Sequence, residues 1–222
     1  MRNDFEKSTF WIKLTEEMKR LNEEYQLKKF GYNLLSDPSK KPEIFIKSFD
    51  SFILKTYRKN VLENERWPEK PEKGWIFPNN WFEQINDIIR TRFIVKYIDG
   101  VEFLVNPIES LYKSLYNQPC KVDYEAKEEG YYAAHVSIKI KFEIMGSSFE
   151  TKIVETPVEI QIMTQLQELI VVLLHKYYET NRKEITRDEK WQWNYKSDEF
   201  AANYLGHILH YVEGMIVEIR DK

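Results

Sequence analysis

The 222-residue chain contains a single cysteine, Cys120, which excludes both an intramolecular disulfide and a cysteine-based zinc cluster. A lone cysteine also fits a reducing compartment, so we expect a cytoplasmic protein. No apolar run approaches the length that crosses a bilayer, and the N-terminal residues do not resemble a signal peptide, so we expect no membrane association. The formal net charge of −3 excludes a uniformly basic surface, so any contact with RNA must be local.

The remaining composition is typical of a soluble globular protein, with 42% hydrophobic and 31% charged residues. The length suits one domain, or a domain with helical extensions. Apolar side chains at helical spacing predict helices over residues 5–25, 100–118 and 197–220, each with an apolar face toward the core. Residues 63–80 lack periodicity and predict a long surface loop.

The stretch from Ile153 to Tyr178 predicts a strand that turns into a buried helix. After Pro157, apolar and polar side chains alternate, as in a strand with one face on the core. Thr164 can cap the helix that follows. Glu159 and Gln161 therefore project from the strand on the side opposite the core, either as ordinary surface residues or as part of a site.

Two more segments present polar side chains in the same way. Residues 93–97 alternate and follow Asp87, and residues 135–144 alternate with His135 facing away from the core. The charged residues 123–130 between them predict a loop.

A basic stripe marks residues 43–60, which we interpret as a helix. Lys47, Ser51, Lys55 and Arg58 follow one another at steps of four, four and three. Like charges at such spacing cost roughly 0.2–0.5 kcal/mol per pair. The stripe is therefore either a solvated helix face or a site for an anionic ligand.

These residue types suit the chemistry of nucleotides. Two carboxylates on neighbouring strands can hold Mg²⁺, which takes oxygen ligands and keeps waters and substrate phosphates. A basic stripe can bind the phosphates of a nucleoside triphosphate, and an aromatic ring beside a glycine can stack on a base.

The order and spacing of these segments resemble the synthetase domain of the RelA/SpoT family. That resemblance implies an α+β fold of nucleotidyltransferase type, a mixed sheet with helices on its faces. It divides the chain into an N-terminal helical extension (1–42), a synthetase core (43–182) and a C-terminal helical extension (183–222). The matching segments are Lys47-Ser48 with Ser51 and Lys55, DIIRTRF at 87–93, GYYAAH at 130–135, VEIQIMT at 158–164 and His175-Lys176.

The resemblance also implies an activity, the transfer of pyrophosphate from ATP to a ribose 3′-hydroxyl with Mg²⁺ as cofactor. Asp87 and Glu159 would be the metal ligands, and Glu159 would also be the base for the attacking hydroxyl. The acceptor would be bound by Tyr131, which stacks on its base, with His135 and Gln161 nearby. The implied ATP-binding residues are Lys47, Ser51, Lys55, Arg58, Arg90 and Arg92.

The chain departs from the family pattern at Phe45, Tyr132 and Met163, where the family has arginines. The loss of basic residues near the acceptor, together with GYYAAH and the C-terminal segment, is similar to the toxic small alarmone synthetases. In that branch some members modify the 3′ end of tRNA, and a neutralising antitoxin is the expected partner. Lys28 and Lys29 would then contribute to a tRNA-binding patch. An alarmone synthetase that uses GDP or GTP, and an inactive nucleotide- or RNA-binding regulator, remain as alternatives.

Overall fold

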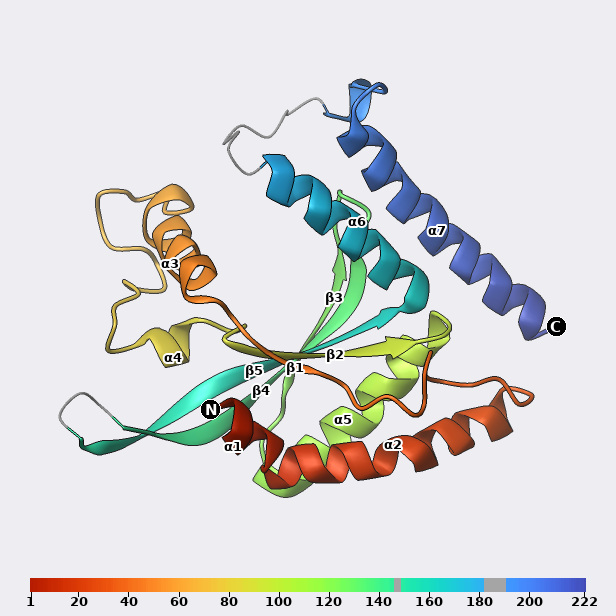
Figure 1. Cartoon of the computed structure of the whole chain (residues 1–222), viewed down its shortest axis with the longest axis horizontal. Helices are drawn as coiled ribbons and strands as arrows, with labels where there is room; N and C mark the ends of the chain where they lie inside the picture. The colour runs from red at the N-terminus through yellow and green to blue at the C-terminus, as the bar shows by residue number, and fades with distance from the viewer. Residues whose placement is uncertain (146–148, 182–190) are drawn as a thin grey trace.

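The computed structural model describes residues 1–145, 149–181 and 191–222, with only the backbone of residues 174–181. It contains a five-stranded sheet in the order β1-β2-β5-β4-β3 (Figure 1). Strands β2 and β5 run parallel and the other neighbours run antiparallel, which confirms the predicted mixed sheet. The strands are β1 (Ile44–Ile46), β2 (Ile89–Val95), β3 (Lys121–Ala126), β4 (Tyr132–Met145) and β5 (Thr151–Thr164).

Helices cover both faces of this sheet. One face carries α1 (Arg2–Glu6), α2 (Thr9–Lys28) and α5 (Asp99–Tyr116), and the other carries α6 (Gln165–Asn181) and α7 (Asp198–Arg220) (Figure 1). On the α6 side of the sheet, the helix α3 (Phe49–Tyr57) continues into a π-helical turn, η1 (Arg58–Leu62), and a long loop leads to α4 (Trp81–Gln84). A short 3₁₀ turn, η2 (Trp191–Trp193), precedes α7. No described helix is long and apolar enough to span a membrane.

The main hydrophobic core lies between the sheet and the helices α2 and α5. Alternate residues of β2 are fully buried there, and Phe93 packs against Trp11 of α2 with ring centroids 6.1 Å apart. Tyr25 packs on Phe103 of α5 at 5.1 Å. Burying each such side chain contributes about 1.5–3 kcal/mol. The residues between the buried ones point to the opposite face, where α3 and α6 lie.

The helices predicted over 100–118 and 197–220 and the strands after Asp87 and His135 are confirmed, and the helix predicted over 5–25 is divided into α1 and α2 before the cap residue Ser8. Two strands were not predicted. Residues 44–46 form β1, so the helix expected over 43–60 begins only at Phe49, where Ser48 caps it. The charged loop expected over 123–130 overlaps β3, which begins at Lys121 and pairs with β4. Because β3 is an edge strand, most of its side chains lie in solvent. This exposure accounts for its charged residues, which predicted a loop.

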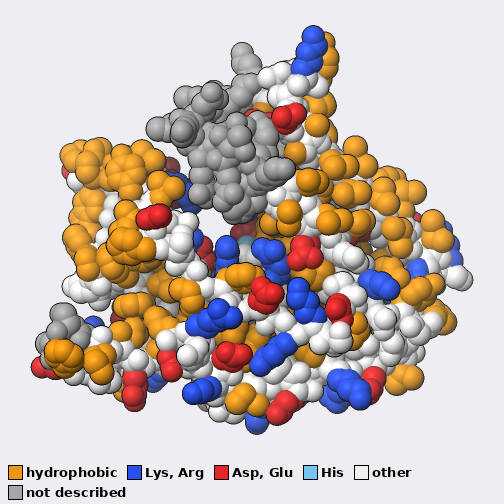
Figure 2. Space-filling model, viewed as in Figure 1, with side chains coloured by type: hydrophobic (Ala, Val, Ile, Leu, Met, Phe, Trp, Pro, Cys, Tyr) orange, Lys and Arg blue, Asp and Glu red, His pale blue; other side chains and the backbone are white. Residues whose placement is uncertain are grey.

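The helix α7 packs in the opposite sense from that predicted. Its buried residues are Asn203, Gly206 and Glu213, whereas the apolar side chains expected in the core are on the outside, where they form an apolar area on the surface (Figure 2). Amphipathic spacing therefore identified the helix correctly and assigned its buried face wrongly. The exposed apolar side chains include Tyr204, Leu205, Ile208, Val212, Met215, Ile216 and Ile219.

Two contacts hold α7 in this orientation. Its last turn places Arg220 on Asp99 of α5 at 2.7 Å and on the hydroxyl of Tyr25 at 2.9 Å. Its middle brings Gly206 against Gly130, in the turn between β3 and β4, so closely that a Cβ atom on either glycine would overlap the other backbone. Gly130 also has φ +75°, a conformation that favours glycine.

We predict that Gly206→Ala lowers the melting temperature, because the new methyl group overlaps the carbonyl oxygen of Gly130. Overpacking of this kind costs about 1–3 kcal/mol, or roughly 2–4 °C per kcal/mol in a chain of this size. Gly214→Ala on the same helix is the control, since nothing lies within 4 Å of its Cβ position. That variant should be neutral or slightly stabilising. Equal melting temperatures for both variants in a calorimetric scan would contradict the glycine contact.

The buried Glu213 predicts a pH-dependent stability. Burial raises its pKa to about 7, offset only in part by the hydroxyl of Thr164. The folded chain therefore binds this proton more tightly than the unfolded chain, so the stabilisation is full below pH 4.5 and is lost as pH rises through 7. The loss is on the order of 3 kcal/mol. Denaturation between pH 5 and 8 should show that Glu213→Gln removes this slope and that Glu218→Gln, exposed on the same helix, keeps it.

Candidate functional site

Asp87 is the residue on which the basic side chains converge. It lies in the turn before β2, and its two carboxylate oxygens accept hydrogen bonds from Lys47 and Lys55, each at 2.8 Å. Burial would raise the pKa of Asp87, but the two lysines outweigh that effect and hold it below its ordinary value. The structure thus brings together three residues separated by up to 40 positions in the sequence.

The basic stripe itself is only partly as predicted. Lys47 precedes the cap of α3 and is not helical, although its amine still reaches Asp87. Ser51 lies in the first turn, bonded to Ser48 through both its hydroxyl and its backbone N–H. Arg58 pairs with Glu63 at 2.7 Å and is more than half exposed, so the structure does not place it with the two lysines.

The residue that continues the stripe is Lys59, which the sequence reasoning missed. Lys59 lies four positions after Lys55, and therefore on the same side of the helix, within the π-helical turn in which the N–H of Glu63 bonds to the carbonyl of Arg58. Lys59 is half-buried, and burial together with the charge of Lys55 lowers its pKa. Among the described residues it has no acidic partner within ion-pair distance. A lysine four positions after Lys55 was the only sequence signal.

The register of the sheet aligns the other candidate residues in two rows on the face away from the main core. One row crosses β1, β2, β5 and β4, and the next crosses β2, β5, β4 and β3. Residues of one row are neighbours because paired Cα atoms lie about 4.5–5.5 Å apart. The first row is Phe45, Arg90, Glu159 and Ser137, and the second is Arg92, Gln161, His135 and Asp123.

Glu159 accepts hydrogen bonds from both sides. Gln161 donates to one oxygen at 3.0 Å, and the Nδ1 of His135 lies 3.2 Å from the other. Burial would raise its pKa, as does the nearby charge of Asp87, but the hydrogen bond from His135 keeps the pKa below its ordinary value. Glu159 is therefore ionised at neutral pH. Arg92 in turn donates to the amide oxygen of Gln161 at 3.3 Å.

Tyr131 extends this network to the turn between β3 and β4. Its hydroxyl lies 2.7 Å from the Nε2 of His135, and burial raises its pKa, so the phenol donates this bond. One neutral tautomer of His135 then accepts from Tyr131 and donates to Glu159. The amine of Lys127 lies 5.2 Å from the centre of the Tyr131 ring. Gly130, the residue before Tyr131, contacts the backbone of α7 at Asn203 and Gly206.

The surface is hollowed between the part that contains α3 and the rest of the molecule, and Lys and Arg side chains gather at the edge of this hollow (Figure 2). A cavity of about 160 Å³ lies between Phe45, Arg92 and Gln161. The ring of Phe45 is 41% exposed and lies 6.0 Å from the guanidinium of Arg90. Aromatic and guanidinium groups together can hold a flat base.

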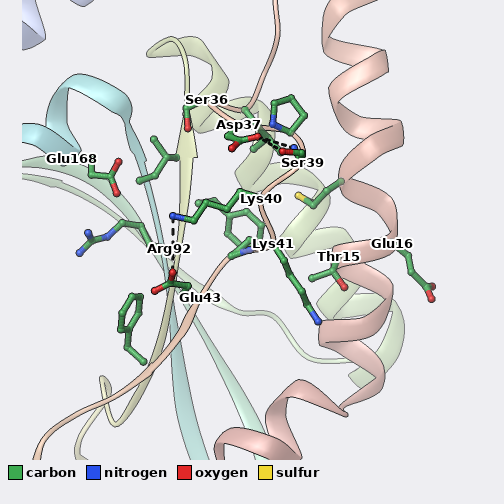
Figure 3. Close-up of a pocket in the computed structure, with 17 residues that line it drawn as sticks. Thr15, Glu16, Ser36, Asp37, Ser39, Lys40, Lys41, Glu43, Arg92 and Glu168 are labelled. Carbon is green, nitrogen blue, oxygen red and sulfur yellow. Dashed lines mark hydrogen bonds and ion pairs between the residues drawn. The ribbon is translucent and has the colours of Figure 1, made fainter.

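A second cavity, of about 460 Å³, shares Phe45 and Arg92 with the first and extends toward α2. Its opposite wall is the loop 36–43, with Lys40 and Lys41 (Figure 3). Both lysines face acids, Lys40 at 4.0 Å from Glu43 and Lys41 at 3.6 Å from Glu6. The wall is consequently of mixed charge.

Two of the three positions where this chain lacks the family arginines, Tyr132 and Met163, are used for packing, whereas Phe45 lines the cavities. Tyr132 donates to or accepts from the Nδ1 of His207 at 2.8 Å and stacks on His210 with ring centroids 3.6 Å apart. Met163 is fully buried. The side chains of His175 and Lys176 lie outside the described residues.

The two lysines expected to bind tRNA are already paired. Lys28 lies 2.8 Å from Glu24, and Lys29 lies 2.6 Å from Asp221 and 3.2 Å from Asp99. They are at the end of α2, on the opposite face of the sheet from α6 (Figure 1). We therefore do not include them in the site.

The acidic residues suit a magnesium ion that is shared with a substrate. No group of three metal-binding side chains occurs in the described part of the chain, so a site closed by protein ligands alone is not formed there. Asp87 and Glu159 supply two carboxylates, and Asp87 already binds two cationic groups. Such a donor set fits Mg²⁺, which is usually held by one or two carboxylates with waters and phosphates.

Comparisons with known proteins agree with this geometry. Residues 46–184 match the model described as the region found in RelA/SpoT proteins. The small alarmone synthetase 2 of Bacillus subtilis has 19% identity and a TM-score of 0.57, with 94% of this chain and 91% of that one covered. No relative was found among curated protein sequences.

Two structures of the small alarmone synthetase 1 of Bacillus subtilis are also similar. The one bound to AMPCPP has 17% identity and a TM-score of 0.53, and covers 95% of this chain and 91% of that one. The one bound to its product pppGpp has 16% identity and a TM-score of 0.51, and covers 97% and 100%. Because the family match spans well over half of the sequence, this chain belongs to the RelA/SpoT family, and its fold is that of the small alarmone synthetases.

Proposed function

We propose that this protein is an ATP-dependent pyrophosphokinase of the toxic small alarmone synthetase type. It transfers pyrophosphate to the 3′-hydroxyl of the terminal adenosine of tRNA, which blocks aminoacylation and stops translation. The observation that carries the transfer chemistry is the convergence of two lysines on Asp87 beside the ionised Glu159. The similar synthetase bound to AMPCPP supports ATP as the donor.

The basic residues hold the donor. Lys47, Lys55 and Lys59 neutralise the triphosphate, and the adenine lies between Phe45 and Arg92 in the small cavity next to Gln161. Transfer of this kind depends on positioning and on neutralising charge, because the protein forms no covalent bond with the substrate.

The two acids act on the reacting atoms. Asp87 and Glu159 would hold Mg²⁺, which when bound neutralises charge on the phosphates. Glu159 accepts the proton of the attacking 3′-hydroxyl, whose oxygen bonds to the β-phosphorus. The bond between that phosphorus and the oxygen bridging to the α-phosphorus breaks, and AMP leaves. His135 and Gln161 fix the orientation of the Glu159 carboxylate.

The packing at two positions favours tRNA over a guanosine nucleotide as the acceptor. GDP and GTP carry two or three phosphates on the 5′ carbon, and these need cations, whereas the terminal adenosine of tRNA carries one phosphodiester. Tyr132 and Met163 are committed to packing and supply no charge. Lys127 is the basic residue that contacts Tyr131, on which the acceptor base stacks.

An alarmone synthetase that uses GDP or GTP is the second candidate, favoured by the similar enzyme bound to pppGpp. If the acceptor is tRNA, the cell needs a means of holding the enzyme inactive. We therefore propose a neutralising antitoxin protein as the partner. We also propose a cytoplasmic location.

We expect γ-labelled ATP to label deacylated tRNA with release of AMP, and to leave GDP unlabelled. Periodate-oxidised tRNA, which lacks the 3′-hydroxyl, should accept nothing. Glu159→Gln removes the base and a metal ligand and should lower the rate at least a hundredfold. Glu155→Gln is the matched control, since this residue lies on the same strand and pairs with Lys139 at 3.7 Å. Labelled GDP with unlabelled tRNA would establish the alarmone synthetase instead.

Two substitutions of Tyr131 separate stacking from hydrogen bonding. Tyr131→Ala removes the ring and should lower kcat/KM for tRNA about tenfold to a hundredfold, because stacking on one base is worth roughly 1–3 kcal/mol. Tyr131→Phe keeps the ring and loses only the bond to His135, so KM for tRNA should stay near the wild-type value. ATP affinity should not change in either variant. A loss of ATP binding, or a lower melting temperature in Tyr131→Ala, would indicate a packing role.

A further inference from the structure

The carboxylate that is expected to bind the metal is already neutralised by the protein. Asp87 has one lysine on each oxygen, at 2.8 Å, and all three side chains are at most 20% exposed. Two ammonium groups supply the same charge as one divalent cation. A metal ion cannot reach these oxygens while both lysines remain, because it would lie in contact with two like charges.

The two lysines can leave Asp87 without a change of fold. Lys47 comes from the segment between β1 and α3, and Lys55 comes from the second turn of α3. Each carries its charge on a flexible four-carbon chain that can rotate toward another anion. A triphosphate is such an anion. Lys59, next to these two lysines, has no acidic partner within ion-pair distance among the described residues, so its positive charge can attract the triphosphate.

We infer that the donor nucleotide forms the metal site: its phosphates draw Lys47 and Lys55 away from Asp87, and only then can Asp87 bind a divalent cation. This inference rests on the proposed use of a nucleoside triphosphate. It gives binding an order, in which the metal enters with the nucleotide or after it. A free divalent cation alone is excluded by the lysines.

Binding of Mn²⁺ without nucleotide tests this order, with electron paramagnetic resonance as the readout. The wild-type protein should bind Mn²⁺ weakly. The double variant Lys47→Met, Lys55→Met should bind it at least about tenfold more tightly, and adding Asp87→Asn should abolish the gain. Lys139→Met, which removes a lysine from a different acid, is the control and should leave Mn²⁺ affinity unchanged.

The outcomes distinguish this inference from the proposed function. The inference is wrong if wild-type protein binds Mn²⁺ as tightly as the double variant and Asp87→Asn abolishes that binding, because the lysines then do not block the site. That result would not contradict the proposed transfer reaction. A double variant that stays folded without any gain would also overturn it. Should the double variant unfold, Lys47→Gln and Lys55→Gln are measured singly, and each should give part of the gain.

Discussion

The register of β5 between β2 and β4 is the constraint on which the rest of the site depends. Parallel pairing places Glu159 beside Arg90, and antiparallel pairing places Gln161 beside His135. A shift of one residue would turn Glu159 into the core and Ile160 toward the substrate. Ile160 and its apolar neighbours on the buried face hold the register, so the same residues that form the core also position Glu159, the proposed general base.

The second property of the site is that both of its acidic side chains are paired before any substrate arrives. Glu159 is held by His135 and Gln161, and Asp87 by two lysines. Removing partly buried charges from water is costly unless each finds a partner, and this pairing offsets that cost in the ligand-free protein. In the proposed reaction the substrates replace these partners, so breaking the pairs reduces the free energy gained on binding. A triphosphate and its metal bring both signs of charge and can replace both sets at once.

Much of this could be predicted from the sequence. Alternating side chains located β4 and β5, and the order of motifs identified Asp87, His135 and Glu159. The rest depended on structure that periodicity does not encode. The strand β1 is too short to alternate, and β3 is an edge strand with solvent on most of its side chains. Arg58 pairs with Glu63, so Lys59 and not Arg58 continues the basic stripe. The helix α7 buries Asn203, Gly206 and Glu213 and leaves its apolar face in solvent. The spacing of apolar residues alone predicts the opposite orientation.

The central claim is that paired charges in the free protein are exchanged for substrate and metal. A crystal structure with Mg²⁺ and a non-hydrolysable ATP analogue tests it most directly, through the distances from the amines of Lys47 and Lys55 to the carboxylate of Asp87. We predict that both distances lengthen from 2.8 Å to beyond ion-pair range. Both amines should then contact phosphate oxygens, and the metal should lie on Asp87. A bound nucleotide with both lysines still on Asp87, and a metal held elsewhere, would contradict the account.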